Sequence, residues 1–170
     1  SVMTYLDHHS IDFDFLDIDI NEMEDEQIET YLEDNRYDII LSGSIVTHYK
    51  WMKWLTNTVR KFNKNSVIII GNSVAGSIPK LFLQHSSADV AILGEGEITC
   101  LEVVKSIIAN EKEVDKIDGL AYKDRNGNIF INKNRKGHKK LDDFPLINWD
   151  KFDTEKYFQK SYAAAKAVSY

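Results

Sequence analysis

Short apolar runs followed by helical periodicity recur along the first two thirds of the chain. The runs at 67–70 and 90–93 contain no alternating polar residues, which is typical of strands buried on both faces of a parallel sheet. A similar strand is predicted at 38–41. Apolar residues behind these runs recur at intervals of three and four, which predicts helices near residues 51–62, 78–85 and 98–108. This order predicts an α/β fold, with a mainly parallel sheet and helices on both faces.

The region before the first apolar run has two other patterns. Residues 1–10 resemble the end of a helix, with no strand before it. Phe13–Ile20 alternates apolar and acidic residues, which predicts a half-exposed or edge strand. The helix that follows is expected to begin at a cap formed by Asn21 or Asp25.

The pattern changes after Asn110. Two short apolar runs, at 119–122 and 129–132, flank the pair Asn126-Gly127. This pair is the strongest short-range signal for a β-hairpin. We expect the hairpin to add antiparallel strands to the edge of the parallel sheet.

The last part of the chain is polar and irregular. The basic run at 133–140 has no aromatic residue for base stacking, so a solvated loop is favoured over a nucleic-acid patch. Residues 142–153 predict an extended linker held down by Phe144 and Trp149. The chain therefore divides into an α/β domain at 1–112, a hairpin and basic loop at 113–140, and a linker at 141–170.

Each of the three predicted apolar strands ends in residues with small side chains. Parallel strands bring their carboxyl ends to one edge, where open α/β sheets bind their ligands. Tight connections favour glycine, serine and asparagine in any case, so a single turn of this kind would mean little. Three in one sheet favour a binding rim with hydroxyls and backbone N–H groups as polar contacts. The turns are Ser42-Gly43-Ser44, Gly71-Asn72-Ser73 and Gly94-Glu95-Gly96.

The chain lacks the residues that other well-known binding and catalytic motifs require. A dinucleotide fingerprint needs a glycine where Thr99 stands, and Glu95 and Glu97 would repel a pyrophosphate. No Gly-Lys-Ser or Gly-Lys-Thr occurs for a phosphate-binding loop. A receiver-type phosphorylation site needs an aspartate at a strand end, whereas Asp38 and Asp89 begin their strands. The two glutamates have no assignable partner for acid–base chemistry, so we expect no catalysis by this chain itself.

Composition narrows the function further. The 170 residues carry a formal net charge of -6, which disfavours nucleic-acid binding. The single cysteine, Cys100, excludes an intramolecular disulfide or a cysteine-cluster metal site, and we expect it to be a small apolar residue of a helix. His85 is expected to be a core or boundary histidine rather than a ligand. No apolar run approaches the ~18 residues of a membrane span, and no charged-then-apolar leader opens the chain, so we expect a cytoplasmic protein without membrane contact.

Several motifs follow one another in a distinctive order. Gly-Glu-Gly-Glu occupies 94–97, and Leu-Asp-Asp-Phe-Pro with Trp-Asp follows the hairpin. With the apolar strands before them, these motifs resemble the cobalamin-binding N-terminal half of cobalamin-dependent radical S-adenosylmethionine enzymes. The resemblance spans about residues 10 to 160. It implies a flavodoxin-like, Rossmann-like sheet that carries cobalamin on its carboxyl rim.

In the same family a barrel domain follows, with a 4Fe-4S cluster and S-adenosylmethionine. A chain with one cysteine cannot bind such a cluster, so we interpret it as an excised domain whose partner is the barrel of the same polypeptide.

The resemblance also assigns cofactor contacts by position. Ser42 and residues 44–47 would face the corrin ring or its nucleotide tail. Gly71 and Asn72 would lie beneath the tail, and Gly94 with Glu95 would close the rim. The expected contacts are Ser42, Gly43, Ser44, Ile45, Thr47, Gly71, Asn72, Ser73, Gly94, Glu95 and Gly96.

Two departures from the family pattern stand out. Asn72 replaces the second glycine that the family often has, which narrows the space for a buried tail. No Asp-x-His-x-x-Gly motif supplies a lower axial histidine. His48 is the imidazole nearest the rim, and a surface position at the start of a helix is favoured over ligation of cobalt.

The family's first strand would lie between those expected at 13–20 and 38–41, and this sequence begins after it. Without that strand, backbone groups would be left unpaired, or another chain or a rearranged pairing would fill the gap. We therefore expect self-association through an unpaired edge, and weak or absent cobalamin binding by this chain.

The function expected from these residues is cobalamin binding in service of radical chemistry in the barrel, with methyl transfer to an unactivated carbon as the reaction class. Two alternatives remain open. The domain could keep the fold without the cofactor, as a docking or lid module. Alternatively, the same rim could bind a nucleotide or another small molecule.

Overall fold

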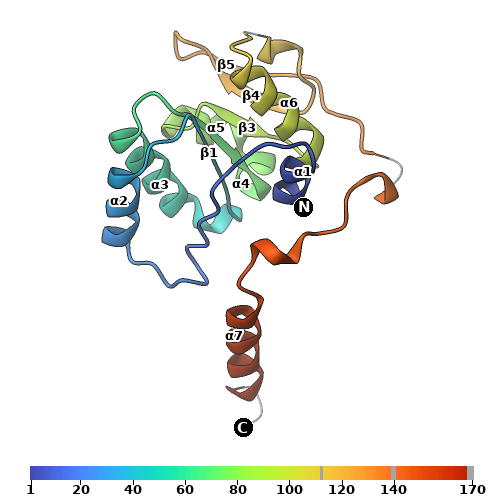
Figure 1. Ribbon diagram of the computed structural model, residues 1–170. Helices are drawn as coiled ribbons and strands as arrows, with labels where there is room; N and C mark the ends of the chain where they lie inside the picture. The colour runs from blue at the N-terminus through green and yellow to red at the C-terminus, as the bar shows by residue number, and fades with distance from the viewer. Residues whose placement is uncertain (112, 139–140, 168–170) are drawn as a thin grey trace.

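A five-stranded sheet forms the centre of the molecule (Figure 1). The computed structural model describes residues 1–111, 113–138 and 141–167. The strand order is β1-β2-β3-β4-β5; the first three strands run parallel, and the last two continue the sheet antiparallel. The strands are β1 (Ile39–Gly43), β2 (Val67–Gly71), β3 (Val90–Ile92), β4 (Leu120–Lys123) and β5 (Ile129–Ile131). This arrangement confirms the predicted α/β sheet and the hairpin at its edge.

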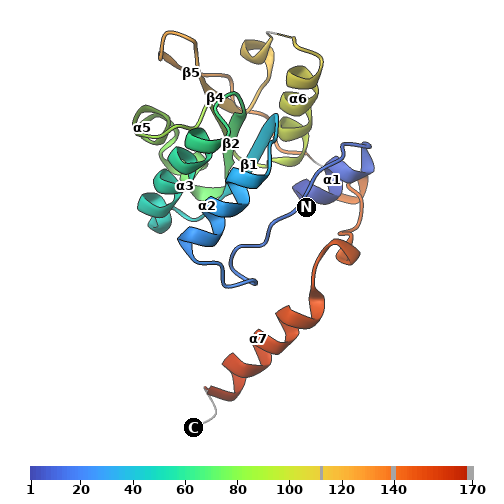
Figure 2. The same ribbon diagram turned by 60° about the vertical axis from the view of Figure 1, so that its left-hand side comes forward.

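Helices cover both faces of the sheet (Figures 1 and 2). Ile68 and Ile70 of β2 pack in one core cluster and Ile69 in the other, because successive residues of a strand point to opposite faces. The first cluster is covered by α2 (Asp25–Asp34), α3 (Tyr49–Phe62), α4 (Asn72–Ser77) and α5 (Pro79–His85). The second is covered by α1 (Val2–His8) and α6 (Glu97–Ile108).

The predicted edge strand at 13–20 is wrong, because that segment has no strand conformation. Phe13 packs against the core on the α1 and α6 face, whereas Ile18 packs against the opposite core. The segment therefore passes from one face of the sheet to the other, and it hydrogen-bonds through side chains. Asp14 accepts from the hydroxyl of Tyr37 at 2.9 Å, and β1 has only β2 as a strand neighbour among the described residues.

Three local expectations also need correction. The N-cap of α2 is Glu24, which forms a capping box with Gln27, rather than Asn21 or Asp25. The turn after β2 continues directly into α4, a helix that the sequence did not predict. His85 is exposed at the end of α5, so it is a surface residue and not part of the core.

The C-terminal part contains more regular structure than a plain linker. Short 3-10 helices occur there at Leu141–Asp143 (η3) and Trp149–Lys151 (η4). Others lie earlier in the chain, at Val46–His48 (η1) and Val114–Lys116 (η2). The last helix, α7 (Thr154–Ala167), projects from the body of the domain in both views (Figures 1 and 2). Within the described ranges, no helix has the length and apolar character needed to cross a membrane.

Candidate functional site

The carboxyl ends of the three parallel strands lie level with one another. Gly43 pairs with Gly71, and Ile70 pairs with Ala91 one residue before the end of β3. The three small-residue turns therefore leave the sheet at the same edge, as the sequence predicted. We call residues 42–48, 71–73 and 94–96 the carboxyl rim.

Hydrogen bonds join the first two turns of the rim. The backbone N–H of Val46 donates to Ser73 Oγ at 2.8 Å. The N–H of Val74 donates to the carbonyl oxygen of Ser44 at 3.2 Å. These bonds link residues almost thirty positions apart, so the turns after β1 and β2 form one continuous surface.

Gly43 allows this close approach. A Cβ atom at that position would lie 3.3 Å from both the carbonyl carbon and oxygen of Gly71, and 3.4 Å from Cβ of Asn72. Those distances are tighter than ordinary contacts, and the atoms crowded first belong to backbone. The absence of a side chain at Gly43 therefore keeps the two turns in contact.

The serine hydroxyl groups of the rim form hydrogen bonds with other atoms of the protein. Ser42 Oγ donates to the sulfur of Met52 at 3.8 Å, and Ser44 Oγ lies 3.1 Å from Nδ1 of His48. Ser73 Oγ is the acceptor for Val46 described above. His48 itself is exposed at the N-cap of α3. The predicted serines thus shape the rim as well as line it.

Asn72 adopts a left-handed backbone conformation, with φ of 63°. Asparagine tolerates this region better than other residues with a side chain, which explains how it can stand where a glycine is common. Its Oδ1 accepts from the N–H of Ser73 at 2.7 Å. The carboxamide is therefore bonded to its own turn, at an exposed position of the rim.

Apolar side chains and open space lie beside these polar groups. Ile45 is 50% exposed and Val46 is 38% exposed, both high values for large apolar residues next to a sheet. A Cβ atom at Gly71 or at Gly94 would have no neighbour within 4 Å. The rim therefore combines open backbone, hydroxyls and exposed apolar groups, as a large amphipathic ligand requires.

The third turn faces different neighbours. Gly94 has φ of +72°, and a Cβ at Gly96 would lie 3.3 Å from a methyl group of Val2 in α1. The carboxylate of Glu95 accepts from the backbone N–H of His138 at 3.3 Å. No hydrogen bond between described residues joins this turn to the other two. Glu95 therefore contacts the basic loop, an arrangement that its predicted role at the rim did not include.

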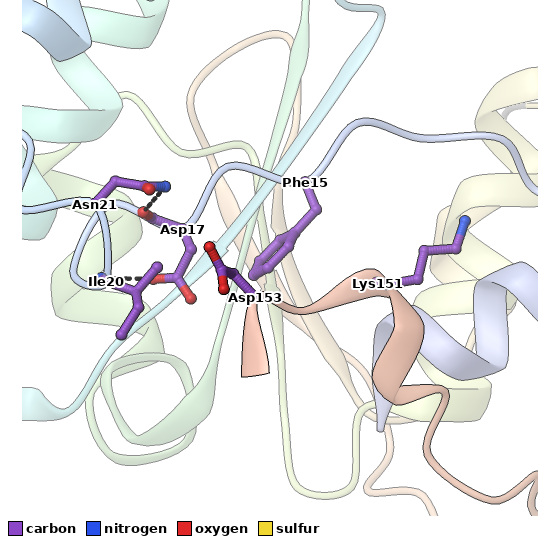
Figure 3. A pocket seen from close by; sticks show the side chains of 6 residues that line it. All are labelled: Phe15, Asp17, Ile20, Asn21, Lys151 and Asp153. Carbon is purple, nitrogen blue, oxygen red and sulfur yellow. Dashed lines mark hydrogen bonds between the residues drawn. The ribbon is translucent and has the colours of Figure 1, made fainter. Parts of the chain in front are cut away.

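A separate hollow of about 150 Å³ lies between the 15–21 segment and the C-terminal linker. In Figure 3 the carboxylates of Asp17 and Asp153 point into the space beside the ring of Phe15. The ammonium group of Lys151 points away from them. Ligand pockets usually measure about 300–1,000 Å³, so this hollow is too small for a corrin ring. None of the predicted rim residues lines it.

Comparison with protein families assigns the domain. The profile of the B12 binding domain family matches residues 1–104, which is more than half of the chain. The chain belongs to this family. The B12-binding domain thus covers the whole parallel part of the sheet and all three turns of the rim.

Two curated relatives share part of this B12-binding domain. Uncharacterized protein MJ1620 of Methanocaldococcus jannaschii is 31% identical over 91 residues, which cover 54% of this chain and 17% of the relative. The cytidylyl-2-hydroxyethylphosphonate methyltransferase of Streptomyces wedmorensis is 28% identical over 124 residues, covering 61% of this chain and 23% of the enzyme. The chain therefore spans less than a quarter of either relative.

Solved structures share the fold. The radical S-adenosylmethionine methyltransferase TsrM from Kitasatospora setae, with cobalamin and a [4Fe-4S] cluster bound, superposes with a TM-score of 0.69 at 12% identity. That match covers 82% of this chain and 26% of TsrM. The cobalamin-dependent S-adenosylmethionine radical enzyme OxsB, with aqua-cobalamin and S-adenosylmethionine bound, gives a TM-score of 0.65 at 21% identity over 80% of this chain and 19% of OxsB. Both are larger single-chain enzymes that contain a domain of this shape.

A Cβ atom at Gly71 or Gly94 would meet no neighbour, and Ile45 and Val46 are exposed, so backbone and apolar side chains of the rim are both accessible to a ligand. The chain supplies no cysteine cluster, and Cys100 is fully buried in α6, as expected. Burial raises the pKa of the Cys100 thiol to about 12, with a smaller contribution from the Glu97 carboxylate, so this thiol stays neutral. The B12-binding domain therefore has a candidate cofactor rim and no cluster ligands of its own.

Proposed function

We propose that the carboxyl rim of this B12-binding domain holds cobalamin for radical chemistry in a separate catalytic domain. One observation supports this most strongly. The turns after β1 and β2 form a single surface, with open space above Gly71 and the exposed side chains of Ile45 and Val46 beside it. A flat macrocycle can rest on such a surface, while the hydroxyls and backbone N–H groups contact its polar edge.

The residues of the chain would have distinct roles in this complex. Ile45 and Thr47 would contact the ring or the tail from the turn after β1. Gly71, Asn72 and Ser73 would lie beneath the tail, and residues 94–96 would close the far side of the rim. Ser42, Gly43 and Ser44 would support the first turn through the contacts described above. Cobalamin would supply a cobalt centre able to carry a methyl group, and the protein would position it and limit the access of water.

The parent protein is proposed to be a cobalamin-dependent radical S-adenosylmethionine enzyme of the methyltransferase class. Two similar proteins, TsrM and the Streptomyces wedmorensis enzyme, are named as methyltransferases, which supports this class. The cluster and S-adenosylmethionine would belong to a C-terminal barrel of the same polypeptide. A cytoplasmic location is part of the proposal and rests on the single cysteine.

A visible-absorption titration with hydroxocobalamin tests the proposal. We expect saturable spectral change with a polypeptide extended at its N-terminus, where the family resemblance predicts a strand beside β1, and weak or no change with this chain alone. Gly71→Leu should weaken binding by about tenfold or more, because a side chain would enter the open space over the rim. Asn65→Leu, an exposed position at the opposite end of β2, is the matched control. Absence of binding by both polypeptides would overturn the proposal.

A second candidate function is favoured by one observation. Glu95, the residue expected to close the rim, contacts the loop that leads to the linker. This contact suits a domain that serves as a docking or lid module without a cofactor. An active parent enzyme that contains no corrin would establish that function. Thermal protection by a nucleotide, and none by cobalamin, would instead point to the third alternative.

A further inference from the structure

The C-terminal linker runs along the N-terminal segment of the same chain. We call residues 144–160 the C-terminal strap. The strap contacts residues 4–22, which lie more than a hundred positions away in sequence, through hydrogen bonds, ion pairs and aromatic pairs. This includes the acidic segment whose alternation suggested a strand.

The first group of contacts is on α1. The backbone N–H of Asn148 donates to Thr4 Oγ1 at 3.1 Å, and its side-chain amide donates to Asp7 Oδ2 at 3.3 Å. Lys151 Nζ lies 3.0 Å from Asp7 Oδ1 and 5.1 Å from the ring centroid of Phe13. Hydrogen bonding from Lys151 and then from Asn148 lowers the pKa of the Asp7 carboxyl below its usual value.

The second group follows the acidic segment. The rings of Phe152 and Phe15 lie 5.4 Å apart in an edge-on arrangement. The hydroxyl of Tyr157, in the first turn of α7, donates to a carboxylate oxygen of Asp17. Both acidic and aromatic residues of the alternating pattern are thus used by the strap.

The third group is formed by lysines of α7. Lys156 Nζ donates to the side-chain oxygen of Asn21 at 3.1 Å. Lys160 Nζ lies 3.4 Å from a carboxylate oxygen of Glu22 and donates to the carbonyl oxygen of Asp19 at 2.7 Å. Lysines of the strap therefore meet acidic side chains and carbonyl groups along successive turns.

The charged side chains that join the strap to residues 4–22 are partly exposed to solvent. The side chains of Lys151 and Asp7 are 39% and 35% exposed, and those of Lys160 and Glu22 are 41% and 76% exposed. Ion pairs of this kind are individually weak and are screened by salt. Binding of the strap to residues 4–22 should consequently weaken as the ionic strength rises.

The helical form of α7 also depends on docking. A helix of 14 residues is marginal in water when it is isolated. Figures 1 and 2 show α7 leaving the body of the domain, with its first part beside the N-terminal segment and the remainder extending outward. Release of the strap should therefore expose the backbone of residues 154–160 to exchange with solvent.

We propose that residues 4–22 form a docking face for the C-terminal strap, and that the charges on this face set the direction in which α7 leaves the domain. The complementary surface is a segment without net charge whose lysines and aromatic side chains face this acidic segment, here supplied by the same chain. The contacts between the strap and residues 4–22 involve no residue of the carboxyl rim. The alternating acidic residues of 13–20 therefore serve the docking of the strap and not strand pairing.

Amide hydrogen exchange of the intact chain, read by mass spectrometry at 50 mM and 1 M NaCl, tests the proposal. We expect residues 154–160 to exchange about tenfold more slowly than an unstructured peptide at low salt, and to lose most of that protection at 1 M, where the Debye length is about 3 Å. Amides of β2 should exchange equally slowly at both salt concentrations, which would show that the core stays folded. Equal protection of 154–160 at both salt concentrations would overturn the proposal.

Charge reversal gives a second test that does not rely on salt. Asp7→Lys should raise the exchange of residues 148–160 at low salt, and adding Lys151→Asp should restore most of the protection. Glu33→Lys, at an exposed position of α2 outside the strap, makes the same change in net charge and is the control. Equal exchange in Asp7→Lys and Glu33→Lys would overturn the proposal. Protection that rises with protein concentration would do the same, since a second copy would then be the partner.

Discussion

Gly43 and Gly71, which are neighbours across β1 and β2, should respond very differently to substitution by alanine. Gly43 and Gly71 are partners in the register of β1 and β2. A Cβ at Gly43 would lie 3.3 Å from backbone atoms of Gly71, whereas a Cβ at Gly71 would meet nothing within 4 Å. Neither residue has a positive φ, so alanine fits the backbone at both positions.

The expected magnitudes follow from these distances. Overpacking costs about 1–3 kcal/mol, and the reduced freedom of the unfolded chain returns about 0.4–1 kcal/mol for Gly→Ala. Gly43→Ala should therefore lower the free energy of unfolding by about 1–2 kcal/mol. Gly71→Ala should change it by less than about 0.5 kcal/mol, because the gain in the unfolded state is offset by the loss of glycine at the N-cap of α4.

Urea denaturation of both variants measures the difference directly. In a thermal unfolding experiment on a chain of this length, the same loss of 1–2 kcal/mol would lower the Tm by about 3–6 °C. Hydrogen exchange should also show faster exchange at Val46 and Val74 in Gly43→Ala, since their bonds join the two turns. Equal stability of the two variants would refute the argument that the turns are in direct contact.

Two further predictions concern buried groups. Asn63, which is 3% exposed, accepts from the N–H of Tyr37 and donates to the carbonyl of Leu32. Asn63→Ala should therefore cost about 2–3 kcal/mol in urea denaturation. Asn63→Asp should cost at least as much, because its buried carboxylate keeps the acceptor but faces the Leu32 carbonyl oxygen. Burial raises the pKa of the Cys100 thiol in the folded protein from its ordinary value of 9.0 to about 12. The resulting stabilisation is complete below pH 9 and is lost as the pH rises toward 12, so Cys100→Ala should reduce the fall in unfolding free energy between pH 8 and pH 10.5. An unchanged slope in that variant would contradict the burial argument.

Local sequence patterns predicted the sheet and most of the helices that pack on its faces. The unbroken apolar run at 67–70 requires burial on both faces, and the pair Asn126-Gly127 requires a tight turn with positive φ at its glycine. Both signals depend on residues close in sequence. For that reason they identified β2 and the β4–β5 hairpin without knowledge of their neighbours.

The errors occur where a distant partner decides the outcome. The alternation of 13–20 specifies two faces but not a pairing strand, and in the structure its acidic side chains contact Tyr37 and Tyr157 instead. The rim residues were predicted from the ends of strands. The bond between Val46 and Ser73, and the turn of Glu95 toward His138, come from tertiary packing that sequence spacing does not encode.

The measurement that tests the central claim most directly is hydrogen exchange of the B12-binding domain with and without hydroxocobalamin. The account predicts slower exchange at residues 42–48, 71–73 and 94–96 on addition of the cofactor, and no change in the hairpin at 120–131. Protection confined to the hollow between residues 15–21 and 151–153, or bound cobalamin with no protection at the rim, would contradict it.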